Sequence, residues 1–223
     1  MKKVGLLIPK TNLTVEYELQ YLFNKGYFDT KHIAFYISKL NYKTSYKENK
    51  EKFLNDLAID SQSKVDDLKY LDVDYISFFC TSSAIVNSDI VIDNNPLNAL
   101  LEEAKQKNIK KCLLITPYND LLGNAVKKEL EINGINVCKS INLNLINTKD
   151  YFEFGTKKLK KFIINNYKTE YKDIIISCTN LPTISIIQEL ESRFNNNIIS
   201  SNSCLFNKIK KENLEWWYDK RRI

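Results

Sequence analysis

The chain has 223 residues, of which 43% are hydrophobic, and a formal net charge of +6 at pH 7. This length allows one large or two small globular domains with a substantial core, and no apolar run is long enough to span a membrane. The first apolar run is ended by Pro9 and Lys10, too early for a signal peptide. We therefore expect a cytoplasmic protein with no membrane partner.

The charges give no sign of a nucleic-acid partner. Basic residues gather only near the end of the chain: Lys208, Lys210, Lys211, Lys220, Arg221 and Arg222. Glu212, Glu215 and Asp219 lie among them, which favours a solvated C-terminal helix over a binding patch.

Short apolar runs alternate with amphipathic stretches throughout the chain, which predicts strands alternating with helices. The predicted strands are 4–8, 32–40, 75–80, 111–116, 136–143, 174–178 and 198–199. The predicted helices are 11–24 with Thr11 or Asn12 as its cap and Gly26 as its stop, 49–70, one after Pro96, one over 122–130 closed by Gly134, 150–167, and one along 187–194. This alternation favours parallel α/β sheets with right-handed crossovers.

Two of the predicted strands end in a similar loop. One reads YISFFCTSSA and places Cys80 before Thr81, Ser82 and Ser83; the other reads IIISCTNLP and places Cys178 before Thr179 and Asn180. Ligands bind at the carboxyl ends of strands in open α/β sheets, and helix N-termini favour thiolates. Pro182 would suit the first turn of the next helix. We therefore predict an active site with two thiols.

The order of elements also repeats. A strand with an Asn12 loop, then two strands and a Cys80 loop, is followed by a strand with a Tyr118 loop, then two strands and a Cys178 loop. We interpret this as two similar α/β lobes, the first formed by 1–95 plus about 200–223 and the second by 96–199. A single doubly wound sheet is the alternative, and it would leave one cysteine loop unexplained.

The other cysteines suggest no further chemistry. Cys112, Cys138 and Cys204 lack polar loops, none of the five cysteines forms a CxxC pair, and the chain has one histidine, His32. We expect reduced thiols and no zinc site. Around Cys80 and Cys178, by contrast, hydroxyls, an amide and backbone N–H groups could bind a carboxylate, although ordinary helix capping would use the same groups.

Several segments together resemble a known family. PKTNLTVEYE (9–18), FCTSSA (79–84), ITPYNDLLGNAVKKELEINGINV (115–137), SCTNLPT (177–183) and ISSNS (199–203) occur in this order. They resemble maleate cis-trans isomerase, a branch of the aspartate/glutamate racemase superfamily that includes arylmalonate decarboxylase. The resemblance covers nearly the whole chain. It implies two Rossmann-like lobes related by a pseudo-two-fold, an active site in the cleft between them, and no cofactor or metal.

The resemblance also implies roles for single residues. It places the catalytic cysteines at Cys80 and Cys178, and ligand-binding side chains at Asn12 and Tyr118. A further family asparagine matches Asn147 best, with Asn144 as the alternative. With the loop donors, the predicted substrate-binding residues are Asn12, Thr81, Ser82, Tyr118, Asn147, Thr179 and Asn180.

The chain also departs from the family pattern. Lys10 stands where a small residue is usual, and SNSCLFNKIKK replaces the usual SNQA and tryptophan. A lysine so near the cleft could change which acid fits the site.

Three functions remain open on the sequence. The first is a cofactor-independent isomerase of a small carboxylate or dicarboxylate, with Cys80 as nucleophile and Cys178 as acid and base. The second is an amino-acid racemase in which the two thiols exchange the α-proton; a decarboxylase with one cysteine ranks third among enzymes. The alternative from another class is a two-lobed protein that binds a small acid without turnover. The assembly is left open, with a homodimer as one option.

Overall fold

The computed structural model describes residues 1–45, 48–86 and 92–219. The basic residues Lys220, Arg221 and Arg222 lie outside the described residues. The strands are β1 (Lys2–Pro9), β2 (Ile33–Leu40), β3 (Tyr75–Phe78), β4 (Lys111–Thr116), β5 (Asn136–Asn142), β6 (Asp173–Ile176) and β7 (Ile198–Ser200). The helices are α1 (Thr14–Asn24), α2 (Lys50–Tyr70), α3 (Thr81–Val86), α4 (Pro96–Gln106), α5 (Asp120–Ile132), α6 (Thr148–Asn166), α7 (Ile184–Phe194) and α8 (Ser201–Asp219), with a short 3-10 turn η1 (Thr169–Tyr171).

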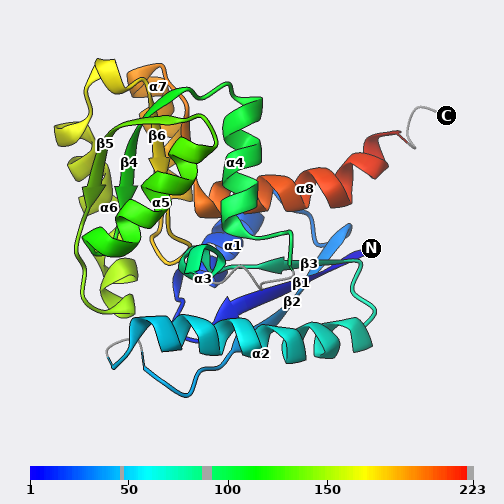
Figure 1. Ribbon diagram of the computed structural model, residues 1–223. Helices are drawn as coiled ribbons and strands as arrows, with labels where there is room; N and C mark the ends of the chain where they lie inside the picture. The colour runs from blue at the N-terminus through cyan, green and yellow to red at the C-terminus, as the bar shows by residue number, and fades with distance from the viewer. Residues whose placement is uncertain (46–47, 87–91, 220–223) are drawn as a thin grey trace.

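The strands form two separate parallel sheets, of order β2-β1-β3 and β5-β4-β6-β7. In each sheet the first strand in sequence lies between the second and the third, so the two sheets repeat one topology (Figure 1). The last strand, β7, is an addition to the second sheet. These sheets confirm the prediction of two Rossmann-like lobes and contradict the alternative of a single sheet.

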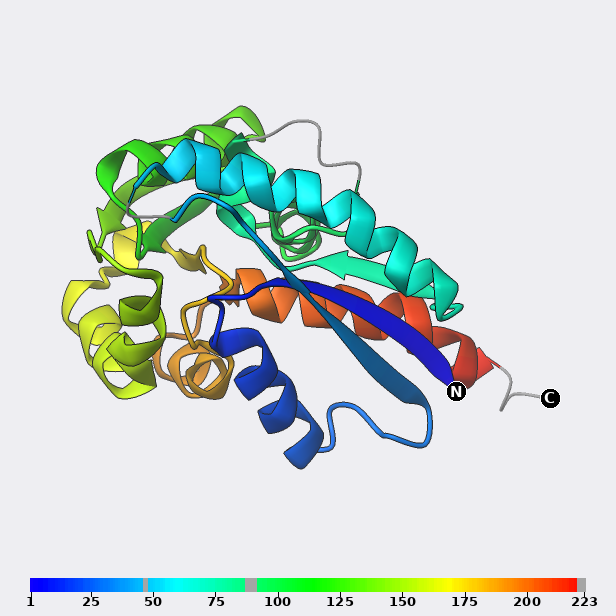
Figure 2. The ribbon, with the colours of Figure 1, turned by 90° about the horizontal axis from the view of Figure 1, so that it is seen from below.

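The faces of the first sheet are covered from both sides. Successive strand residues point to opposite faces, and Leu7 packs with Leu57 of α2 while Leu6 and Ile8 join the larger core with Val15 of α1. Figure 2 shows α2 on one side of this sheet and α1 on the other. The larger core continues into the second sheet, so the two lobes share buried apolar surface.

Local sequence signals explain most helix ends. Asn49, Asn95 and Asn119 cap α2, α4 and α5 by accepting backbone N–H groups. The N-cap residue of α1 is Leu13, not Thr11 or Asn12, although the Asn12 side chain accepts the N–H groups of Thr14 and Val15 at 2.9 and 3.1 Å. Glu16, in the first turn of α1, pairs with Lys39.

Several helices differ from their predicted bounds, among them α1, which begins at Thr14, and α7, which begins at Ile184. Helix α6 begins at Thr148, two residues earlier than predicted, and Gly155 interrupts it with φ of 71° and ψ of 156°. Pro182 does not enter the first turn of α7, because Thr183 is the N-cap residue and the helix begins at Ile184.

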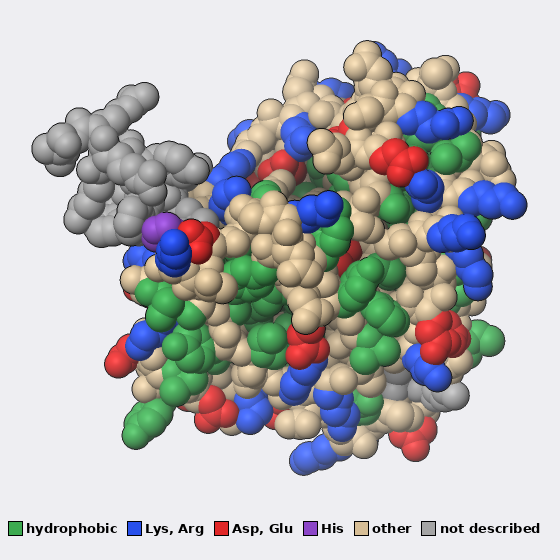
Figure 3. Space-filling model, turned by 180° about the vertical axis from the view of Figure 1, so that it is seen from behind, with side chains coloured by type: hydrophobic (Ala, Val, Ile, Leu, Met, Phe, Trp, Pro, Cys, Tyr) green, Lys and Arg blue, Asp and Glu red, His purple; other side chains and the backbone are tan. Residues whose placement is uncertain are grey.

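The C-terminal helix connects the lobes. Helix α8 follows β7 of the second sheet directly and packs against α4 and against β3 of the first sheet (Figure 1). The division of the chain at about 95 and 200 stays a prediction, as does a homodimer. On the face in Figure 3, basic side chains lie beside acidic ones rather than in one block.

Within the described ranges, no helix has both the length and the apolar character that crossing a membrane requires.

Gly123 marks a close approach between α5 and β5. A Cβ at this position would lie 2.0 Å from the Asn142 side-chain oxygen, which accepts a hydrogen bond from Thr116 at 2.9 Å. We expect Gly123→Ala to lower the free energy of unfolding by about 1–3 kcal/mol, because Asn142 must move in a packed environment. Asn124→Ala, at the exposed neighbouring position, is the control and should leave stability unchanged or slightly higher. Urea unfolding measures both, and equal stabilities of the two variants would contradict the prediction.

Candidate active site

The ends of both sheets contribute to one cavity. Its 14 lining residues are Pro9, Thr11, Asn12, Phe53, Leu57, Cys80, Thr81, Ser82, Tyr118, Thr148, Tyr151, Cys178, Thr179 and Asn180. The space among them is about 410 Å³, part of it open to solvent. Asn12 and Cys80 follow the adjacent strands β1 and β3, and Tyr118 and Cys178 follow the adjacent strands β4 and β6. The two pairs therefore occupy equivalent edges of the two sheets, where a doubly wound topology places ligands.

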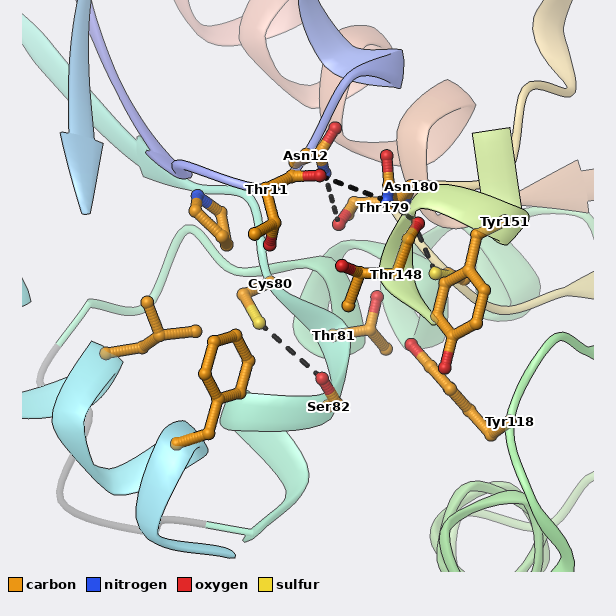
Figure 4. Close-up of a pocket in the computed structure, with 14 residues that line it drawn as sticks. Thr11, Asn12, Cys80, Thr81, Ser82, Tyr118, Thr148, Tyr151, Thr179 and Asn180 are labelled. Atoms are coloured by element: carbon orange, nitrogen blue, oxygen red, sulfur yellow. Dashed lines mark hydrogen bonds between the residues drawn. The ribbon is translucent and has the colours of Figure 1, made fainter. Parts of the chain in front are cut away.

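Cys80 lies on the side of the cavity formed by the first sheet. Its Sγ is 3.6 Å from the hydroxyl of Ser82, as Figure 4 shows. Burial raises the pKa of the Cys80 thiol, while the Ser82 hydroxyl and the N–H groups of Ser83 and Ser82 act in the opposite direction. These donors are the groups that would stabilise a thiolate when one forms.

Cys178 lies on the side formed by the second sheet, next to Tyr118. The Tyr118 hydroxyl hydrogen-bonds the Cys178 thiol, and the Asn180 N–H donates to its Sγ at 3.3 Å. Burial raises the pKa of Cys178 to about 12 despite these donors, and the nearby Cys80 raises it further. Burial also raises the pKa of Tyr118 well above its usual value. Cys178 therefore holds its proton at neutral pH.

The two cysteine loops are bonded directly to each other. The Thr179 hydroxyl donates to the carbonyl of Phe79 at 2.9 Å and accepts the Asn12 amide at 3.2 Å. Thr81 donates to Ser201 at 3.1 Å. The side chains of Thr81 and Thr179 thus line the cavity but are already engaged in bonds between elements.

The Asn180 side chain joins three segments in the same way. Its oxygen accepts the Leu13 N–H at 2.9 Å and the Thr14 hydroxyl at 3.3 Å, and its amide donates to the Thr148 carbonyl at 2.6 Å. Ser82 differs from Thr81 and Thr179, because its hydroxyl lies against a cysteine, Cys80, whereas theirs bond to other elements.

The structure does not bring Asn147 to the cavity. Its amide donates to Asp150 at 2.7 Å in the capping box of α6, and the neighbouring Thr148 lines the cavity instead. The alternative Asn144 is exposed, with its amide on the Asn142 carbonyl at 3.1 Å. The prediction failed here because it started α6 at Asp150 and so missed the cap.

Lys10 also lies outside the lining. Its ammonium lies 3.9 Å from the centre of the Tyr42 ring, in a cation–π contact. None of the lining side chains carries a formal charge at neutral pH. Among the described residues, no three His, Cys, Asp or Glu side chains gather as a metal ion would require.

Sequence reasoning missed two groups of lining residues. Phe53 and Leu57, one helical turn apart on α2, belong to the core and also form the apolar wall beside Cys80. Tyr151 lies one turn after Thr148 on α6, and its ring centre is 6.1 Å from that of Tyr118 (Figure 4). Their helical spacing was visible in the sequence, but nothing in it distinguished the core from a cavity wall.

The remaining cysteines lie away from the cavity. Cys112 and Cys204 are buried, Cys138 is exposed, and all five cysteines are unpaired thiols.

These features describe a two-lobed α/β protein with a buried thiol at each of two equivalent loops. The family model described as arylmalonate decarboxylase matches residues 94–215, more than half of the chain. The chain therefore belongs to the arylmalonate decarboxylase family. A search of curated proteins gives no match.

Solved structures share the fold. A cysteine-to-alanine variant of the maleate isomerase Iso from Pseudomonas putida S16 with maleate has a TM-score of 0.82 at 17% identity, covering 95% of this chain and 91% of that one. A cysteine-to-serine variant of Nocardia farcinica maleate cis-trans isomerase with a covalently bound succinylcysteine intermediate has a TM-score of 0.80 at 16% identity, covering 94% and 91%. Unliganded arylmalonate decarboxylase has a TM-score of 0.68 at 15% identity, covering 93% and 90%.

The raised pKa of Cys178 predicts slow alkylation of this thiol. Because only the thiolate reacts, its rate with iodoacetamide should rise about tenfold per pH unit from pH 7 to 9 without levelling off. Peptide mass spectrometry follows each cysteine separately, and the exposed Cys138 serves as the internal accessible thiol. A rate at Cys178 that levels off below pH 9 would show that the thiol ionises far below pH 12.

Proposed function

We propose that this chain is a cofactor-independent cis-trans isomerase of a small unsaturated carboxylic acid of the maleate type. The observation that carries the proposal is the pair of buried thiols, Cys80 and Cys178, lining one cavity from equivalent loops of two sheets. Addition to an alkene and protonation of the adjacent carbon need two such groups on either side of a substrate.

Each step of the proposed reaction uses one thiol. The Cys80 thiolate adds to one alkene carbon, and the electron pair of the double bond moves to the carbon next to a carboxylate. That carbon takes the proton from the Cys178 thiol, which becomes a thiolate, and the former double bond is now free to rotate. Cys178 then removes a proton from the same carbon, the double bond reforms, and the Cys80 thiolate leaves.

The surroundings of the two thiols support this assignment of roles. Cys178 keeps its proton at neutral pH and accepts hydrogen bonds from Tyr118 and the Asn180 N–H, which would stabilise its thiolate after proton transfer. Cys80 has the Ser82 hydroxyl and two backbone N–H groups around it. Two adjacent thiolates would repel each other, so the reacting form is Cys80 ionised and Cys178 neutral.

The proposed substrate contacts follow from the same lining. The substrate carboxylate binds to N–H groups of the two cysteine loops, with Asn12, Tyr118, Ser82 and Thr148 closing the site. Thr81, Thr179 and Asn180 hold these loops in place through their own bonds. Asn147 is no longer part of the proposal.

The amino-acid racemase alternative is less well supported by the lining. An α-ammonium group in a buried site needs a carboxylate or several acceptors, because burying an unpaired charge is costly. The lining contains no aspartate or glutamate. A decarboxylase would need one thiol only and would leave Cys80 without a role.

Single-cysteine variants test the assignment. After incubation with maleate, Cys178→Ala should carry a covalent adduct on Cys80 and show no turnover, because the attacking thiol remains while the Cys178 acid and base is lost. Cys80→Ala should carry no adduct and show no turnover. Intact-mass and peptide mass spectrometry detect the adduct, and fumarate formation measures turnover.

Cys138→Ala is the matched control and should keep full turnover, because Cys138 is exposed and outside the cavity. An adduct on Cys178 in the Cys80→Ala protein would reverse the roles. Binding of maleate without turnover in the wild-type protein would favour the non-catalytic acid-binding alternative.

A further inference from the structure

A buried carboxylate connects α1 to the Cys178 loop without lining the cavity. Glu18 is 2% exposed, and its Oε1 accepts the N–H groups of Thr183 at 2.5 Å and Ile184 at 2.7 Å. These N–H groups belong to the start of α7, where a carboxylate is favoured. These N–H groups therefore bond to Glu18 and not to the Cys178 thiol, although the sequence predicted that the thiol would face a helix N-terminus.

The second oxygen of Glu18 leads back to the cysteine loop. Asn202, fully buried at the start of α8, donates through Nδ2 to Glu18 Oε2 at 2.5 Å and to the Thr179 carbonyl at 3.0 Å. Thr179 directly follows Cys178. Glu18 on α1, Asn202 on α8 and Thr179 on the loop thus form one continuous hydrogen-bonded chain.

We propose that Glu18 is a positioning residue, whose ionised carboxylate orients Asn202 and thereby holds the Cys178 loop for proton transfer. The role in proton transfer rests on the isomerase function proposed above, whereas the orientation of Asn202 is a property of the structure that can be measured without turnover.

The bonding geometry explains why ionisation matters. An ionised carboxylate only accepts, so the Asn202 amide must turn its NH₂ toward Glu18, and the same NH₂ then reaches the Thr179 carbonyl. If Oε2 carries a proton, its O–H meets the NH₂ of Asn202, and two donors face each other. Turning the amide over would satisfy the O–H but would place Oδ1 against the Thr179 carbonyl, and the bond to the loop would be lost.

The pKa of Glu18 places this change near neutral pH. Burial raises it from 4.5 to about 7, while the N–H groups of Ile184 and Thr183 and the amide of Asn202 act in the opposite direction. Glu18 therefore loses its proton as the pH rises through about 7, and the ordered loop is the form above that pH.

Other titratable groups nearby are accounted for. On the elements around Glu18, Glu189 pairs with Lys160, Glu191 with Lys107, and Lys208 with Glu102; Glu16, on the same helix, pairs with Lys39. The same two helices also carry basic side chains at Arg193 on α7 and at Lys210 and Lys211 on α8. Cys178 and Tyr118 keep their protons across this range.

Glu18→Gln mimics the protonated form at every pH. Its NH₂ should displace Asn202 from Thr179 and lower kcat for maleate at pH 8 by about tenfold or more, with KM nearly unchanged, since an unsatisfied buried donor is costly. The ratio of the wild-type kcat to the Glu18→Gln kcat should therefore increase from near one at pH 6 to about tenfold or more at pH 8. A rise of kcat caused by ionisation of Cys80 or of the substrate is common to both proteins and cancels in this ratio.

Glu16→Gln is the matched control, because it removes a carboxylate from the same helix without touching the Cys178 loop. It should keep the wild-type kcat and pH profile. A ratio of wild-type to Glu18→Gln kcat that does not change between pH 6 and 8, or a wild-type kcat in that variant at pH 8, would overturn the positioning role.

Alkylation of Cys178 separates this inference from the proposed function. The ratio of the iodoacetamide rate in Glu18→Gln to that in the wild-type protein should be near one at pH 6 and about fivefold or more at pH 8, since the released loop is more accessible. This result would support the positioning role even if maleate were not turned over. A ratio that does not change with pH would overturn it.

A measurement on the wild-type protein covers the case in which Glu18→Gln does not fold. Isotope-edited infrared spectroscopy of ¹³C-labelled glutamate should show one carboxyl group titrating near pH 7. Titration of every glutamate below pH 5 would contradict the inference.

Discussion

The active site depends on the bonds that the Cys178 loop makes to the first lobe. Asn180 accepts from Leu13 and Thr14, and Thr179 donates to the carbonyl of Phe79, the residue before Cys80. All of these groups are buried or partly buried, so breaking one leaves a donor or acceptor without water, at a cost of about 1–3 kcal/mol. The two thiols are therefore held by direct bonds between their own loops, not only by the packing of distant helices.

The absence of charged side chains from the lining is compatible with the acid substrate proposed above. A fixed lysine or arginine in the wall would bind the carboxylate strongly in every state of the reaction, whereas neutral donors can be directed at the charge that develops. Lys10 is the nearest candidate for such a cation by sequence, but its ammonium lies over Tyr42 instead. In the proposed reaction, the thiols and the substrate supply the charge.

The sequence was sufficient for the sheets, and most of the residues predicted for the site line one cavity, although their roles stay predictions. Short β-branched runs ending in Cys80 and Cys178, together with the repeated order of loops, predicted two parallel sheets whose equivalent ends meet. It failed at Asn147, because whether an asparagine caps a helix or faces a ligand depends on where the helix begins. It also missed Phe53 and Tyr151, because an apolar helical face has the same spacing whether it covers core or cavity.

Glu18 shows why the deepest part of the network could not be predicted. In the sequence it is an ordinary acidic residue within an amphipathic helix, and its partners Thr183 and Asn202 lie more than 160 positions away. Only the folded chain brings α1, the start of α7 and the start of α8 to one point. At the start of α8, Ser201 bonds to Thr81 of one cysteine loop and Asn202 to Thr179 of the other. Two consecutive residues of the C-terminal helix therefore bond to the Cys80 loop and to the Cys178 loop.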